Sequence, residues 1–242
     1  MQTPPPVTLL EELGRGSTAV VWRAALTEPI AALPAATEVA CKRYLDAPEA
    51  RACYVREAKI GATINAPGLV KHYASGEDDE GPWVLMELIP GRNIAEVLAQ
   101  EHALAEPLVR SIGRQLASAL AALHEAGISH GDLKPENARL DQEGRSVLVD
   151  LGFAGSDGAW DEATRGTPLY LAPEQTRGAT LSPAADVFSL GVVLYELVTG
   201  THPFVASQSK DTAEVFRAIA AGGAPPPSLR APTVSTFLDH LL

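Results

Sequence analysis

Residues 130–137 read HGDLKPEN, and this short run places an acid, a cation and an amide within one predicted loop. Asp132 could accept a proton from a hydroxyl, Lys134 could neutralise a phosphoryl group in transfer, and Asn137 could hold Mg²⁺. An ordinary polar loop can carry the same residue types, so the run by itself leaves catalysis and a solvated loop equally open. The rest of the chain has to decide between them.

The composition is that of an ordinary folded protein. With 242 residues, 46% of them apolar and 20% charged, the chain can bury the core of one large domain or of two small lobes. The net charge of −11 argues against a nucleic-acid or anionic-membrane partner and slightly favours basic peptides. Cys41 and Cys53 are too few for a disulfide framework, no apolar run is long enough for a membrane span, and the start lacks a signal-peptide pattern. We therefore expect a soluble, cytoplasmic protein.

The pattern of apolar residues changes near residue 90. Before it, alternating apolar runs predict strands over Val7–Leu13, Val20–Ala25, Glu38–Arg43, Leu69–Ala74 and Trp83–Leu88. Helical spacing predicts helices over Pro48–Ile64, Ile94–Gln100, Pro107–Ala126, Pro183–Val198 and Thr212–Ala220. The sequence thus predicts an α+β fold, with a small sheet lobe over residues 1–89 and a larger, mostly helical lobe over residues 90–242.

A glycine-containing segment lies in the turn of the first predicted hairpin. Residues 13–21 read LGRGSTAVV, and Gly14 and Gly16 would let backbone N–H groups approach phosphates closely. Ala19 stands where a GxGxxG pattern has its third glycine, so a plain hairpin turn would be the favoured interpretation of this segment alone. The segment does not open a helix, which argues against a dinucleotide-binding fold.

Two further parts of the chain complete a set of residues suited to phosphates. Lys42 lies on a predicted strand, and Glu57 on the next predicted helix could pair with it and aim it at α- and β-phosphates. Asp150 ends a strand in the run VDLG, and its carboxylate suits Mg²⁺, which prefers oxygen ligands. A lone DLG is a turn in most proteins, but its place just beyond Asn137 favours a metal site.

The later motifs are the most specific. Residues 166–174 read GTPLYLAPE, residues 186–191 read DVFSLG, and residues 202–204 read HPF. With the earlier motifs, in this order and over nearly the whole chain, they resemble a eukaryotic-type (Hanks-type) serine/threonine protein kinase, in a compact, Ala- and Pro-rich style typical of bacteria. The resemblance implies a bilobal protein kinase fold over residues 1–242. It also implies transfer of the ATP γ-phosphoryl group to serine or threonine hydroxyls of a protein substrate.

The resemblance assigns catalytic roles by position. Lys42 and Glu57 would form the activating ion pair, Asp132 would receive the proton of the acceptor hydroxyl, and Lys134 would contact the γ-phosphate. Thr167 resembles the signature of enzymes that are specific for serine and threonine.

The same resemblance implies ATP and Mg²⁺ as cofactors. The metal would be bound by Asn137 and Asp150, Met86 would be the gatekeeper, and the backbone of residues 87–89 would bond the adenine. The residues implied for binding the nucleotide are Gly14, Gly16, Val21, Ala40, Lys42, Met86, Glu87, Leu88 and Ile89.

The residue before Asp132 departs from the family pattern. Gly131 replaces an arginine that normally pairs with a phosphate on the activation loop. We therefore expect that phosphorylation of Thr164 or Ser156 is not the main switch. Such a kinase would be active without it or controlled by other parts of a longer protein.

The hydrophobic column that couples the two lobes in this family also departs from the pattern. Counted without gaps, it would consist of Gly61, His72, His130 and Leu151. Gly61 offers no side chain and His72 is polar, whereas the loss of a leucine-sized group from a core costs about 2–5 kcal/mol. The sequence therefore predicts either poor packing at this place or compensation by neighbours such as Ile60.

Two more departures from the family pattern concern the residue under the adenine base and the end of the chain. Arg139 falls where an aliphatic residue normally lies under adenine, and its guanidinium could stack on a purine or fill the pocket. Family members continue past the equivalent of Leu242 to an arginine that pairs with the equivalent of Glu174. We therefore expect the helical lobe to be incomplete at its end.

Two other functions remain open. The departures would suit a pseudokinase that senses nucleotide or acts as a scaffold, although all six residues implied in phosphate handling are intact. The run HGD also resembles the catalytic loop of aminoglycoside phosphotransferases, which are small-molecule kinases. However, those enzymes lack a segment like residues 166–174.

Overall fold

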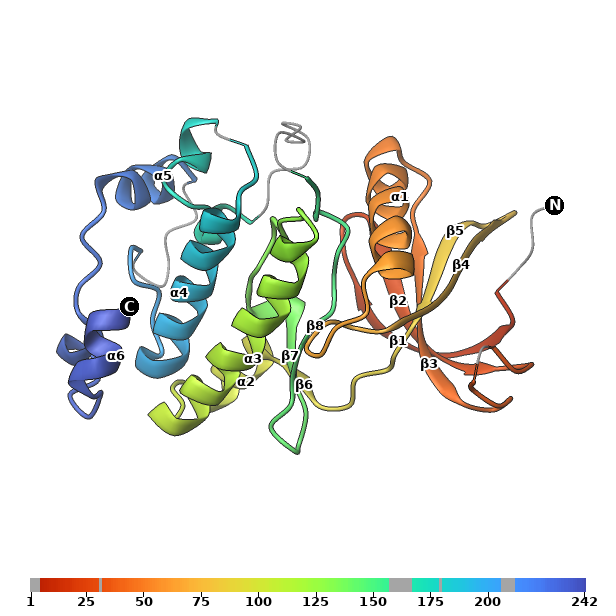
Figure 1. Ribbon diagram of the computed structural model, residues 1–242, viewed down its shortest axis with the longest axis horizontal. Helices are drawn as coiled ribbons and strands as arrows, with labels where there is room; N and C mark the ends of the chain where they lie inside the picture. Colours follow the sequence, from red (N-terminus) through yellow and green to blue (C-terminus); the bar gives the residue numbers. More distant parts are fainter. Residues whose placement is uncertain (1–4, 31, 157–166, 179, 206–211) are drawn as a thin grey trace.

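Among the described residues before residue 90, the chain forms five strands and one long helix (Figure 1). The computed structural model describes residues 5–30, 32–156, 167–178, 180–205 and 212–242. The strands lie in the order β1-β2-β3-β5-β4, and all neighbours pair antiparallel. Their bounds are Val7–Arg15 (β1), Ala19–Leu26 (β2), Glu38–Tyr44 (β3), His72–Asp78 (β4) and Gly81–Met86 (β5).

Helix α1, Pro48–Thr63, packs on this sheet by one face. Its buried residues follow one another at steps of three or four positions, which places them on the same side of a helix: Ala50, Cys53, Glu57 and Ile60. Pro48 in the first turn suits a helix start because its missing N–H would be unpaired there anyway. Among these apolar residues Glu57 is a carboxylate with no exposed surface, so it must find its partners inside the lobe.

The second lobe is mainly helical and lies beside the first (Figure 1). Its helices are α2 (Ile94–Glu101), α3 (Glu106–Glu125), α4 (Pro183–Thr199), α5 (Thr212–Ala221) and α6 (Thr236–Leu241). A small antiparallel sheet consists of β6 (Arg92–Asn93), β7 (Ala138–Leu140) and β8 (Ser146–Leu148). Short 3₁₀ turns are η1 (Pro135–Asn137), η3 (Pro168–Tyr170), η4 (Gln175–Arg177) and η5 (Pro227–Leu229).

Helices α3 and α4 form the core of the helical lobe. Gly113 on α3 faces Leu194 on α4 so closely that an added Cβ would lie 3.0 Å from a Leu194 methyl carbon. The α3 side chains Ile112, Leu116 and Leu120 are at most 2% exposed. This close packing fixes α4, whose Asp186 contacts the loop that carries residues 130–137.

The predicted α+β class and the antiparallel sheet lobe with one main helix are confirmed. One strand prediction was misplaced: β4 begins at His72, and Leu69 makes only an isolated bridge to Leu148. The expected strand before Asp150 is β8, which ends at Leu148, whereas β6 and β7 were not predicted, because two or three residues carry no detectable alternation. In the part of the chain that the structure describes, no helix combines the length and the apolar composition needed to cross a membrane.

Candidate active site

A cleft of about 220 Å³ opens between the two lobes. The sheet lobe contributes strand residues to its lining, and the connection after β5 contributes its backbone and side chains. The helical lobe contributes residues from η1, from β7 and from the segment after β8. The expected site residues on this lining are Gly14, Val21, Ala40, Lys42, Met86, Glu87, Leu88, Ile89, Asn137 and Asp150.

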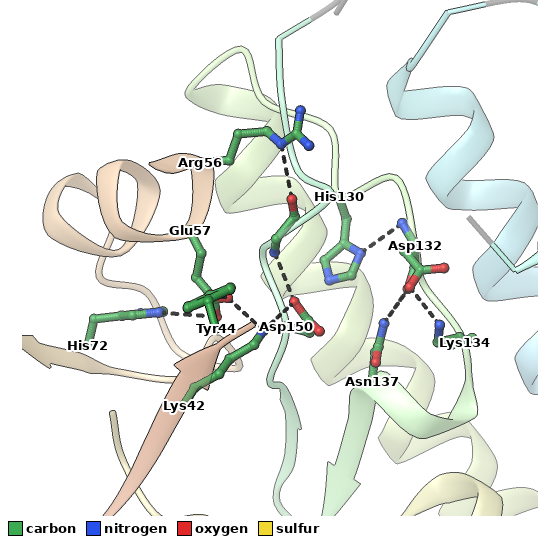
Figure 2. Close-up of polar contacts among 11 residues, drawn as sticks. Lys42, Tyr44, Arg56, Glu57, His72, His130, Asp132, Lys134, Asn137 and Asp150 are labelled. Atoms are coloured by element: carbon green, nitrogen blue, oxygen red, sulfur yellow. Dashed lines mark hydrogen bonds and ion pairs between the residues drawn. The ribbon is translucent and has the colours of Figure 1, made fainter. Parts of the chain in front are cut away.

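The Lys42 ammonium lies at the back of this cleft between two carboxylates. Its Nζ donates to Glu57 Oε2 at 2.7 Å and to Asp150 Oδ1 at 2.9 Å (Figure 2). Lys42 is 5% exposed and Glu57 is fully buried, so water screens this pair only weakly. The Tyr44 hydroxyl also donates to Glu57 Oε2.

The charges of this cluster stabilise one another. Burial alone would lower the pKa of Lys42, but the carboxylates of Asp150 and Glu57 outweigh it and raise that pKa above its ordinary value. Burial would raise the pKa of Glu57, yet the Lys42 ammonium and the His72 ring hold it well below its ordinary value. Both groups are therefore charged at neutral pH, and removing one partner would leave an uncompensated buried charge.

The loop over residues 130–137 forms a second polar cluster, on the helical side. Both oxygens of Asp132 are bound: Oδ1 accepts from the Thr167 N–H at 3.0 Å, and Oδ2 accepts from Asn137 Nδ2 at 2.9 Å. Lys134 Nζ lies 2.7 Å from Asp132 Oδ2 and donates to the Thr167 hydroxyl at 2.8 Å. Asp132 is 5% exposed, and these contacts hold its carboxylate in one orientation.

A buried aspartate in the first turn of α4 binds the backbone of this loop. Asp186 accepts the His130 N–H at 2.7 Å and the Gly131 N–H at 2.9 Å, one on each oxygen. His124 Nε2 lies 2.8 Å from the same carboxylate. The sequence assigned Asp186 no role. A motif at the start of a helix does not show that the side chain binds a backbone N–H 55 residues earlier in the chain.

The residues expected to bind metal fit a hard cation. Asn137 Nδ2 donates to both the carbonyl and the carboxylate of Asp132, at 2.8 and 2.9 Å, so the amide oxygen is the group that remains for a cation. Asp150 adds a carboxylate, and in Figure 2 it lies between the Lys42 cluster and the Asp132 cluster. Carboxylate and amide oxygens are ligands that Mg²⁺ accepts.

The expected packing defect at Gly61 and His72 needs correction. An added Cβ on Gly61 would lie 2.3 Å from His72 Cγ, so the imidazole ring occupies the space that a side chain at position 61 would need. His130 and Leu151, the other members of the expected column, are at most 1% exposed. The His72 ring therefore fills both its own position and the space beside Gly61. The spacing of residues in the sequence could not show this.

The structure also decides where the Arg139 side chain points. Its Nε donates to the Ile89 carbonyl at 3.1 Å, and its Nη2 donates to the Gly91 carbonyl. The residue still lines the cleft, but its guanidinium binds the backbone that connects the lobes. These two hydrogen bonds hold the guanidinium at the lobe connection.

Some of the expected residues lie beside the cleft and not on its lining. Glu57 lies behind Lys42, Asp132 and Lys134 lie next to Asn137, and Gly16 lies in the hairpin turn, where its N–H donates to Ala19 O at 2.8 Å. Thr164, considered as a modification site, is outside the described residues, whereas Ser156 is described and exposed.

Sequence analysis also missed residues of the site. Tyr44 lies two positions after Lys42 on the same strand, and this period of two could have placed both on one face. Val70 and Val149 line the cleft from segments that pair across the lobes, and no local pattern shows that pairing.

Known proteins resemble this chain over most of its length. Residues 7–242 match the protein kinase domain family. The chain is 34% identical over 180 residues to the serine/threonine-protein kinase PknL of Mycobacterium tuberculosis, covering 73% of this chain and 45% of PknL. It is 34% identical over 246 residues to PknE of Mycobacterium bovis (98% of this chain, 42% of PknE) and 33% identical over 213 residues to ULK3 of Rattus norvegicus (86% and 45%). The chain thus spans less than half the length of these relatives.

Proposed function

Because the chain belongs to the protein kinase domain family, we propose that it transfers the γ-phosphoryl group of ATP to a serine or threonine hydroxyl of a protein. The observation that carries the proposal is the convergence of two charge clusters on one cleft. Lys42, Glu57 and Asp150 form the first, and Asp132 and Asn137 belong to the second. The names of the relatives support the choice of serine and threonine as acceptors.

In this proposal ATP lies in the cleft with its base under the sheet lobe. Ala40 and Val21 offer apolar contacts above the base, and the connection after Met86 offers backbone groups. The Glu87 N–H already donates to Lys71 O, and Arg139 already occupies the Ile89 carbonyl. Among the described residues this leaves the Glu87 carbonyl, the N–H and carbonyl of Leu88, and the Ile89 N–H for hydrogen bonds with adenine.

The triphosphate would extend toward the two clusters. Lys42, aimed by Glu57, would contact the α- and β-phosphates, while Gly14 and Gly16 would approach the phosphates from the hairpin above. Mg²⁺, held by Asn137 and Asp150, would supply neutralisation of phosphate charge.

Asp132 would orient the acceptor hydroxyl and receive its proton. Its carboxylate is already held by the Thr167 N–H and by Asn137, so it needs little reorganisation when a substrate arrives. Lys134, 2.7 Å from Asp132, would neutralise charge on the transferring phosphoryl group. The protein's contribution is therefore positioning and electrostatics.

The first test is the substitution Asp132→Asn. We expect phosphoryl transfer to a generic basic protein to fall by a factor on the order of 10²–10⁴, since a positioned base contributes about that much. Binding of Mg·ATP should change little, because Asp132 lies beside the cleft lining. Radiolabelled transfer and nucleotide affinity would be measured on the same preparations.

The control is Asp46→Asn, at an exposed carboxylate outside the cleft lining. It should transfer phosphate at the parental rate. An Asp132→Asn protein as active as the parent would refute the role of Asp132, and a parent that binds Mg·ATP without transfer would favour a nucleotide-sensing scaffold.

A further inference from the structure

The imidazole of His72 lies against the backbone of α1 at Gly61. Three of its ring atoms, Cγ, Nδ1 and Cδ2, would lie 2.3–2.6 Å from a Cβ built on Gly61. Real Cβ atoms do not approach other atoms so closely, so even alanine at position 61 would displace the ring. The glycine and the histidine therefore depend on each other.

The same ring faces the oxygen of Glu57 that the rest of the cluster leaves unpaired. Oε2 accepts from both Lys42 and Tyr44, whereas His72 Nε2 lies 3.5 Å from Oε1 (Figure 2). Within the described part of the chain Oε1 and both ring nitrogens are buried and have no hydrogen-bond partner. The His72 side chain is 6% exposed and the Glu57 side chain is fully buried, so water offers neither group an alternative. A buried carboxylate oxygen without a donor is costly.

We propose that His72 is a positioning residue that holds Glu57, and through Glu57 aims Lys42, from a place that exists only because residue 61 is glycine. A movement of a few tenths of an ångström brings Nε2 into hydrogen-bond distance of Oε1. The carboxylate would then be held at both oxygens, by β3 on one side and by β4 on the other. The inference about Lys42 rests on the proposed function, whereas the pairing of His72 with Glu57 does not.

The activity test compares two substitutions. His72→Leu fills the space without a donor, and we expect kcat to fall about tenfold, with a smaller effect on the KM for ATP. His72→Gln keeps a neutral N–H donor, so it should remain near the parent. His240→Gln, at an exposed histidine on α6, is the matched control and should behave like the parent.

A purely structural role predicts a different result. His72→Gln would then lose as much kcat as His72→Leu, and that result would overturn the proposal. Unchanged kcat in His72→Leu would overturn it as well.

A second test needs no catalysis and therefore separates this proposal from the proposed function. Urea-unfolding midpoints would be measured for the parent, His72→Leu, Glu57→Gln and the double variant. We expect His72→Leu to lower the midpoint in the parent and to have less than about half that effect in the Glu57→Gln background. If Glu57→Gln does not fold, Gly61→Ala replaces it, because it displaces the ring from Glu57.

Equal effects of His72→Leu in both backgrounds would refute the pairing whether or not the protein transfers phosphate. Coupling without any transfer activity in the parent would support the pairing and reject the proposed function.

Discussion

Gly131 lies at a position that leaves no room for a longer side chain. Its φ is +78°, in the left-handed region that glycine adopts without cost, and its N–H is held by Asp186. An added Cβ would lie 2.7 Å from a methyl carbon of Leu181 and 3.0 Å from the Phe153 carbonyl oxygen. Leu181 thus occupies the space into which an arginine side chain would have to extend. The position before Asp132 therefore has no space for the arginine that other family members carry there.

Restoring a side chain at position 131 should therefore destabilise the protein. We expect Gly131→Ala and Gly131→Arg to lower the free energy of unfolding by more than the roughly 1–2 kcal/mol that left-handed backbone costs a residue with a Cβ. Urea unfolding would measure both variants. Gly144→Ala is a matched control, because Gly144 has φ +80° and nothing within 4 Å of its added Cβ. If Gly131→Ala cost no more than Gly144→Ala, the contact with Leu181 would not be the constraint.

At the scale of elements, a tyrosine and a glutamate connect η3 to α4. The Tyr170 hydroxyl donates to Glu196 Oε2 at 2.9 Å. Burial raises the pKa of Glu196 to about 7; the hydrogen bond from Tyr170 opposes this shift, and the charge of Glu136 adds to it. In the folded protein Glu196 is therefore protonated over a pH range in which the unfolded chain has already lost that proton.

This shift makes the stability of the protein depend on pH. A carboxyl whose folded pKa is raised contributes stability that is complete below the unfolded value of 4.5 and is lost as pH rises through about 7. Between pH 5 and pH 8 we expect the parent to lose about 1–3 kcal/mol of unfolding free energy relative to Glu196→Gln, whose side chain cannot ionise. Urea unfolding at several pH values would measure the difference. Glu125→Gln, at an exposed position on α3, should follow the parent, and a Glu196→Gln profile parallel to the parent's would contradict the assignment.

At the scale of the whole molecule, the cleft joins parts of the chain that pack in separate lobes. Lys42 from β3 reaches Asp150, which belongs to the helical side, and the Val70 N–H pairs with Leu148 O at 2.9 Å. A ligand in this cleft would contact both lobes at once. Since such a ligand binds the folded chain only, it should stabilise the fold by mass action.

Mg·ATP should therefore raise the melting temperature. At a concentration about 100 times its dissociation constant it would stabilise the fold by about 2.7 kcal/mol, which corresponds to about 5–10 °C for a chain of this length. Differential scanning fluorimetry would measure this shift, with ATP plus EDTA and the Asp150→Asn variant as comparisons, and both should show a smaller shift. An equal shift without metal would remove the support for a magnesium site at Asn137 and Asp150.

The sequence alone determined the fold class, the family and the order of the motifs, and the family match and the sheet topology confirm these. It could do so because strand alternation, helical spacing and the run at residues 130–137 are local patterns, set by backbone geometry and by the chemistry of phosphate transfer. The assignment of catalytic roles to individual residues of that run stays a prediction until the substitutions are made.

The tertiary structure decided what distant residues do to one another. The ring of His72 fills the space at Gly61, the Arg139 guanidinium binds the lobe connection, and Leu181 closes the space beside Gly131. Each of these depends on the distance between side chains from different elements. The separation of two residues in the sequence does not determine this distance, because packing in three dimensions sets it.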